Sequence, residues 1–156
     1  MSLSSAWLLQ CGEDLSIAVG DREMVELVQG QSTHPVPGAP AHCSSVLVWQ
    51  ENIAPIMDLA VLYRGQSLDH ESSYLCLLNY QAAPHQPIQQ VALRVTEAPE
   101  RIQVDDGQFC ELSPELASSL FKPVTLSCFS HHAKNVLILD IASLCSAEFR
   151  ELAAAA

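Results

Sequence analysis

Val36-Pro37-Gly38-Ala39-Pro40 opens the stretch of sequence that decides the fold, and two apolar runs follow it, Ser45-Val46-Leu47-Val48-Trp49 and Pro55-Ile56-Met57-Asp58-Leu59. The runs are rich in β-branched residues and are bounded by polar or turn-forming residues, a pattern typical of strands. A short polar step, Gln50-Glu51-Asn52, separates them. We therefore predict two strands joined by a tight turn, behind a loop whose turn residues are Pro37, Gly38 and Pro40.

The composition indicates a packed globular protein with an acidic surface. Of 156 residues, 49% are hydrophobic and 16% are charged, which is enough apolar material for a core. The formal net charge is −11 and only seven Lys and Arg residues are present. This charge balance argues against nucleic acid and anionic membranes as partners.

The N-terminal residues lack both a basic start and a long apolar segment, so they do not resemble a signal peptide. No apolar run approaches the length of a membrane span. We therefore expect a cytoplasmic protein. Most cysteines lie within apolar runs, where they behave as small hydrophobes, and we expect reduced core thiols rather than disulfides. The six are Cys11, Cys43, Cys76, Cys110, Cys128 and Cys145.

The rest of the chain reads as further short strands with turns between them. Apolar segments predict strands at 6–11, 14–19, 24–28, 74–80, 88–95, 102–104, 124–129 and 135–140. The apolar residues 60–63 continue the extended segment beyond Asp58. We predict one helical turn at 113–117 and a C-terminal helix in which Leu144, Phe149 and Leu152 share a packed face. The polar connector near residues 66–73 is the expected boundary between two lobes.

The segment around Asp58 has an echo near the end of the chain. Asp58 and Asp140 each follow an apolar strand, and each has an apolar residue four positions beyond it. Two similar β lobes packed on one another explain such a repeat. We expect each aspartate to end its strand and to accept backbone N–H bonds in the turn that follows. This structural role is favoured over an acid–base role.

These segments, taken in order, resemble the CheW family of adaptors that couple chemoreceptors to the CheA histidine kinase. The family's partner-binding strand, its proline loop, its next strand with the turn, and the strand after that turn correspond to Met24-Val25-Glu26-Leu27, residues 36–40, residues 45–51 and residues 54–59, without a gap. Val136 to Asp140, with Leu144, fits the closing strand and helix start. The resemblance implies an all-β fold over residues 1–156, with two five-stranded SH3-like barrels that share a core and a short C-terminal helix.

The resemblance also implies a scaffold without catalysis or cofactor. One surface of such an adaptor docks the kinase's regulatory domain, and another docks the cytoplasmic tip of a methyl-accepting chemoreceptor. Met24 and Glu26 match the partner-binding strand of the family. Ser45, Gln50 and Glu51 replace a Gly, an Arg and a Gly of the family pattern. Losing the Arg removes a fixed cation, so receptor docking of the usual kind is in doubt. Adaptors of type IV pilus and twitching-motility systems vary in this way.

Two other functions remain open from the sequence. The first keeps the scaffold but gives it another pathway partner, because the hairpin turn departs from the family. The second is a small-ligand or metal-binding β-barrel that uses Cys128 with His131-His132, or His42-Cys43. No metal-ligand spacing of a known type is present, so we predict no metal site. An enzyme comes last, because no nucleophile elbow or phosphate-binding loop occurs.

Overall fold

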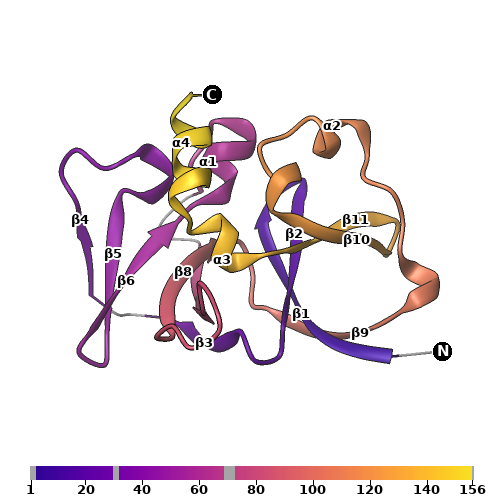
Figure 1. Ribbon diagram of the computed structural model, residues 1–156, viewed down its shortest axis with the longest axis horizontal. Helices are drawn as coiled ribbons and strands as arrows, with labels where there is room; N and C mark the ends of the chain where they lie inside the picture. Colours follow the sequence, from indigo (N-terminus) through magenta and orange to yellow (C-terminus); the bar gives the residue numbers. More distant parts are fainter. Residues whose placement is uncertain (1–2, 30–31, 69–72, 156) are drawn as a thin grey trace.

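The computed structural model describes residues 3–29, 32–68 and 73–155 of the chain, which form a two-lobed, mainly β structure (Figure 1). The strands are β1 (Leu3–Gly12), β2 (Leu15–Gly20), β3 (Met24–Val28), β4 (Thr33–Pro35), β5 (Ser45–Trp49), β6 (Asn52–Met57), β7 (Tyr74–Tyr80), β8 (Gln89–Val95), β9 (Glu100–Asp105), β10 (Thr125–His131) and β11 (Lys134–Leu139). The helices are α1 (Leu59–Arg64), α2 (Pro114–Ala117), α3 (Ile141–Leu144) and α4 (Ala147–Ala155), with 3-10 turns at Ala41–Cys43, Asp106–Gln108 and Lys122–Val124.

The strands form two sheets, one in each lobe. The first lobe has the order β10-β11-β2-β1-β9, and the second has the order β3-β7-β8-β6-β5-β4. The expected two-lobed β fold is confirmed. The second sheet has a sixth short strand, β4, which was not predicted because its segment is rich in proline. The sheets do not divide the chain near residues 66–73, because β3 to β6 and β7 to β8 belong to the same sheet. Residues 69–72 of that connector lie outside the described part.

The two sheets share one plan. Each contains a single parallel pair, β11 beside β2 with Leu137 opposite Ile17, and β6 beside β8 with Ile56 opposite Ala92. In each sheet the last strand of a hairpin makes the parallel pair, and a helix follows it directly. The internal repeat seen in the sequence therefore corresponds to a repeat of β topology.

A shared core joins the lobes. The largest buried cluster takes Leu9 and Ile17 from the first sheet and Leu78 and Leu93 from the second, all fully inaccessible to solvent. The N–H of Thr96 also donates to the carbonyl of Gln10 across the lobes, at 2.8 Å. Burial of large aliphatic side chains contributes about 1.5–3 kcal/mol each, so the lobes are held as one unit.

Residues 59–64 form a helix rather than extending the strand from Asp58. The Asp58 side chain caps α1 by accepting from the N–H of Ala60 at 3.1 Å, and Gly65 ends the helix at φ 73°. Leu59 and Ala60, the first two residues of α1, are buried. The capping residues at both ends of the segment therefore favour a helix, although its run of apolar side chains is typical of a strand.

The proline-rich loop contains a tight turn. The N–H of Ala39 donates to the carbonyl of Val36 at 3.2 Å, and Gly38 between them has φ 77°. Proline followed by glycine suits a type II turn of this kind. Pro40 then precedes the 3-10 turn at Ala41–Cys43, from which the carbonyl of His42 accepts the N–H of Asp58 at 2.8 Å.

The C-terminal helix α4 forms as predicted and packs against the core through Phe149. Leu144 is also buried, but it lies on the separate helix α3. Leu152 is 40% exposed, so its expected place on the packed face is wrong. Cys145 and Ser146 end α3 before α4 begins, which breaks the single helical face assumed from the sequence.

Candidate partner-binding surface

Strand β3 forms one edge of the second sheet and contains a β-bulge. Met24 pairs with Leu78 and Glu26 pairs with Leu77, so Val25 is the extra residue between two successive pairs. Val25 and Glu26 are consequently both exposed, whereas Met24 is half-buried against the core. Bulges on edge strands redirect side chains and occur beside functional sites. β3 thus presents an apolar and an acidic side chain next to each other on an open strand edge.

A tight turn positions the start of β3. The Glu23 carboxylate accepts the N–H of Gly20 at 2.9 Å, and the carbonyl of Glu23 accepts the N–H of Asn79 at 2.7 Å. Burial raises the pKa of Glu23, and the nearby charge of Asp140 adds to the effect, while the bond from Gly20 opposes it. The Glu23 carboxylate therefore stabilises the turn by its hydrogen bond, although burial makes its charged form less favourable.

A groove lies beside this turn, between the β7–β8 loop and the start of α3. Its larger pocket has a volume of about 780 Å³ and its smaller pocket about 320 Å³, and both are lined by Tyr80, Gln81, Asp140 and Ala142. Burial raises the pKa of Tyr80 to about 12, and its hydroxyl donates to Gln89 at 2.8 Å. The groove was not predicted, since it joins segments far apart in the chain.

The hairpin of β5 and β6 carries Ser45, Gln50 and Glu51, but it does not bring them together. Gln50 and Glu51 form the two-residue turn, while Ser45 lies at the other end of β5, about 17 Å away along an extended strand. Ser45 is half-buried between Pro35 and Ile56. The structure therefore places the five expected binding residues in three locations: β3, the hairpin turn and the start of β5.

Both residues of that turn have a left-handed backbone. Gln50 has φ 45° and Glu51 has φ 70°, which are the signs of a type I′ turn, a geometry that favours Asn and Gly. A left-handed conformation costs a residue with a side chain about 1–2 kcal/mol. The tip thus keeps the shape that glycine would allow and carries strain. The equivalent turn of β10 and β11 has His132 at φ 50° and Ala133 at φ 63°.

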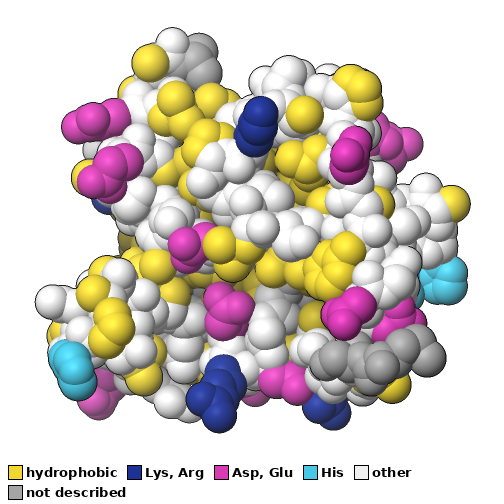
Figure 2. Space-filling model, turned by 45° about the vertical axis from the view of Figure 1, so that its right-hand side comes forward, with side chains coloured by type: hydrophobic (Ala, Val, Ile, Leu, Met, Phe, Trp, Pro, Cys, Tyr) yellow, Lys and Arg dark blue, Asp and Glu magenta, His cyan; other side chains and the backbone are white. Residues whose placement is uncertain are grey.

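The outer face of the same hairpin is apolar. Val48 and Ile53 lie opposite each other across the two strands, and both are exposed, Ile53 by 69%. Trp49 lies on the other face, where it is partly buried against the cluster of Leu47 and Ala54. Asp and Glu side chains are spread among such hydrophobic patches over the face drawn in Figure 2.

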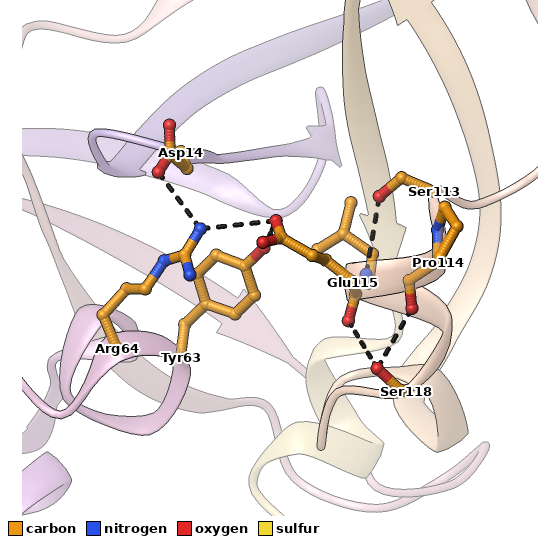
Figure 3. Close-up of polar contacts among 8 residues, drawn as sticks. Asp14, Tyr63, Arg64, Ser113, Pro114, Glu115 and Ser118 are labelled. Atoms are coloured by element: carbon orange, nitrogen blue, oxygen red, sulfur yellow. Dashed lines mark hydrogen bonds and ion pairs between the residues drawn. The ribbon is translucent and has the colours of Figure 1, made fainter.

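A polar network links α1 of the second lobe to the first lobe (Figure 3). Arg64 donates to Asp14 in the β1–β2 turn at 3.1 Å and to Glu115 on α2 at 3.3 Å. The hydroxyl of Tyr63 donates to the same Glu115 oxygen at 3.3 Å, and the Arg64 guanidinium lies 4.6 Å from the Tyr63 ring centre. The charged side chains of these contacts are largely exposed, so the contacts add little to the shared core in holding the lobes together.

Two kinds of feature are absent from the described residues. Within residues 3–29, 32–68 and 73–155, no group of three or more His, Cys, Asp and Glu side chains is placed to hold a metal ion. Over the same ranges, no helix is long and apolar enough to span a membrane. His131 and His132 contact each other, with ring centres 4.1 Å apart, at the tip of β10.

The molecule has two β lobes around one core, an edge strand that exposes Val25 and Glu26, a strained hairpin tip, and a groove beside the β7–β8 loop. These features suit a scaffold that binds other proteins. A family model described as a CheW-like domain matches residues 6–149, so the chain belongs to the CheW-like family of chemotaxis scaffolds and adaptors. The scaffolding protein TtCheW from Thermoanaerobacter tengcongensis has a similar structure, with a TM-score of 0.68, 17% identity, and coverage of 89% of this chain and 90% of that chain. No curated protein sequence matches the chain.

Proposed function

We propose that this protein is a non-enzymatic adaptor that couples a CheA-type histidine kinase to chemoreceptors. The observation that carries the proposal is the bulge in β3, which exposes Val25 and Glu26 together on an open strand edge of a CheW-like fold. An exposed edge with an apolar and a charged side chain suits docking of another β domain. The kinase's regulatory domain, which has the same fold in this family, is such a partner.

The coupling in this proposal is mechanical. The shared core holds the two lobes in one orientation. A partner on β3 and a partner on the hairpin or in the groove are then held in a defined relation to each other. A change in one partner alters the other through geometry, without a chemical step. Both partners act in the cytoplasm, and so would this adaptor.

A second candidate keeps the scaffold and changes the receptor-side partner. The turn Gln50-Glu51 favours it, because the chain retains a strained left-handed turn there without the family's Arg and Gly. A partner with basic groups would suit Glu51 and the net charge of −11. Pathways that control type IV pili or twitching motility would supply such a partner.

One experiment separates the two candidates. The wild-type protein and the double variant Gln50→Arg, Glu51→Gly are incubated with the cognate kinase and the receptor's cytoplasmic fragment, and ternary complexes are isolated. The adaptor proposal predicts a ternary complex with the wild-type protein. A kinase complex that gains receptor only with the double variant favours the second candidate. Failure of both proteins to bind kinase, while they are folded by circular dichroism, rejects the first candidate.

A further inference from the structure

The first lobe is closed by a short pairing that follows β9. β9 and β10 are the two edges of its sheet, and after the 3-10 turn at Asp106–Gln108 the chain returns beside β10. Phe109 makes an antiparallel bridge with Phe129, and the N–H of Cys110 donates to the carbonyl of Cys128 at 3.0 Å. We call this pairing the seam of the first lobe.

Two thiols face each other across the seam. The sulfur atoms of Cys110 and Cys128 are 3.4 Å apart, and their residues lie directly opposite in the antiparallel pairing. Cys110 is exposed, whereas Cys128 is only 3% exposed. The side-chain oxygen of Asn135 lies 3.4 Å from the Cys128 sulfur and also accepts the N–H of Ser113 at 3.1 Å. The pair therefore has one member open to solvent and one held in place behind it.

The other cysteines lack this arrangement. Cys11 and Cys76 are both buried, and burial raises the pKa of each, to about 12 for Cys76. Cys43 and Cys145 are half-buried, and burial raises the pKa of both thiols. Thiols become reactive when they are exposed and can ionise. Of the six cysteines, only Cys110 is exposed.

We propose that Cys110 and Cys128 form a thiol modification site, which a peroxide converts to an intramolecular disulfide. In the first step, Cys110 loses its proton, the thiolate attacks one oxygen of hydrogen peroxide, the O–O bond breaks, and a sulfenic acid forms. The hydroxide that leaves takes up the proton from Cys110 and becomes water. In the second step, the Cys128 sulfur attacks the Cys110 sulfur and the S–O bond breaks. The displaced hydroxide leaves as water with the Cys128 proton. Both thiols are oxidised together by two electrons, and one peroxide is reduced to two waters.

The geometry supports this order of events. Cys110 is exposed and meets the oxidant first, whereas Cys128 is 3% exposed and its sulfur lies 3.4 Å from that of Cys110, where it can attack the sulfenic acid. Bond formation requires the sulfurs to approach from 3.4 Å to the disulfide length of about 2.0 Å, which side-chain rotation within the seam can supply. Cys110 is thus the site that meets the oxidant, and Cys128 is the resolving thiol.

The disulfide would link the two segments of the seam covalently. Residues 110–113 lead directly into α2. Glu115 on this helix forms an ion pair with Arg64 of the second lobe. Linking Cys110 to β10 restricts the segment that carries α2, and so restricts one of the contacts between the lobes. We expect the oxidised protein to resist proteolysis after Glu111 more than the reduced protein, with the difference removed by a dithiol reductant.

The test treats the purified full-length protein with hydrogen peroxide and maps its peptides after alkylation. Cleavage with glutamyl endopeptidase and trypsin separates the two cysteines, because Glu111 lies between them and Lys134 separates Cys128 from Cys145. We expect a linked peptide pair that contains Cys110 and Cys128, and loss of two of the six reactive thiols from the unfolded protein. Oxidation of Cys110 to sulfinic acid while Cys128 remains a free thiol would overturn the proposal.

Three variants make the test specific. Cys110→Ser should abolish the link and leave Cys128 unmodified, and Cys128→Ser should leave a sulfenic acid on Cys110 that a sulfenic-acid probe traps. Cys43→Ser is the matched control and should form the link as the wild-type protein does. If Cys128→Ser does not fold, the exposed Cys110→Ser variant and the wild-type protein still decide. A disulfide between any other two cysteines, persisting in Cys110→Ser, would also contradict the proposal.

Discussion

Asp58 and Asp140 occupy equivalent places in the two lobes. Each follows the strand that makes the parallel pair of its sheet, and each caps the helix that comes next. Asp58 accepts the N–H of Ala60 at 3.1 Å, and Asp140 accepts the N–H of Ser143 at 3.4 Å. The chain thus uses one strand–Asp–helix unit twice, once in each lobe.

The two caps should differ in their contribution to stability. Asp58 is buried and accepts two further bonds, from the hydroxyl of Ser67 at 3.0 Å and the N–H of Leu68 at 2.9 Å. Asp58→Ala should lower the free energy of unfolding by about 2 kcal/mol or more, because buried donors lose their acceptor. Asp140→Ala should cost about 1 kcal/mol, as for a partly exposed cap. Urea denaturation of both variants tests this order, and equal losses would contradict it.

Relief of strain at the hairpin tip should stabilise the protein. Glu51 has φ 70°, a conformation that glycine adopts without steric cost. We expect Glu51→Gly to raise the free energy of unfolding by about 0.5–1 kcal/mol, since the strain removed exceeds the added freedom of the unfolded chain. Ala133→Gly, at φ 63° in the equivalent turn, is the matched variant and should act in the same direction. A lower midpoint of denaturation for both would show that the turns are unstrained.

Stability should depend on pH through Glu23. Its pKa is raised in the folded protein above the ordinary value of 4.5, mainly by burial. The folded state therefore disfavours the charged carboxylate at neutral pH. This penalty decreases as the pH falls through the raised pKa and is lost once the pH is below 4.5. Glu23→Gln, which keeps an acceptor for Gly20, should be more stable than the wild-type protein at pH 7, and the advantage should fade in acid. The denaturation midpoints of the two proteins, compared from pH 7 to below pH 4.5, measure this advantage.

The control for this effect is Glu97→Gln, which removes the same charge from an exposed position outside the strands. It separates the local effect of burial from the general benefit of reducing the net charge of −11. An advantage of Glu23→Gln that persists unchanged in acid, or that Glu97→Gln reproduces fully, would show that burial of Glu23 is not its source.

Local sequence signals predicted most strands, because alternating or continuous apolar runs bounded by turn residues identify them without tertiary information. The capping roles of Asp58 and Asp140 were also readable from the repeated pattern. The helix α1 was not predicted, because the run from Ala60 to Tyr63 is as apolar as a strand, although Asp58 and Gly65 cap it at its two ends. The bulge at Val25 and the groove at Tyr80 depend on strand register and on contacts between distant segments, which periodicity does not encode.

The β3 edge should contribute to partner binding through charge. Glu26→Lys reverses an exposed charge on β3 and should weaken binding of the kinase's regulatory domain by tenfold or more, about 1.4 kcal/mol. Glu100→Lys makes the same change on β9, the edge strand of the first lobe, and serves as the matched control. The account expects little effect from Glu100→Lys. Equal weakening by both would indicate a general effect of net charge rather than a site on β3.

The most direct test of the account is a calorimetric titration of the wild-type protein with the regulatory domain of its cognate CheA-type kinase. The adaptor account predicts saturable binding of one protein to one domain, with a dissociation constant on the order of 10 μM or tighter. The absence of binding at several times that concentration, with both proteins folded, would contradict it.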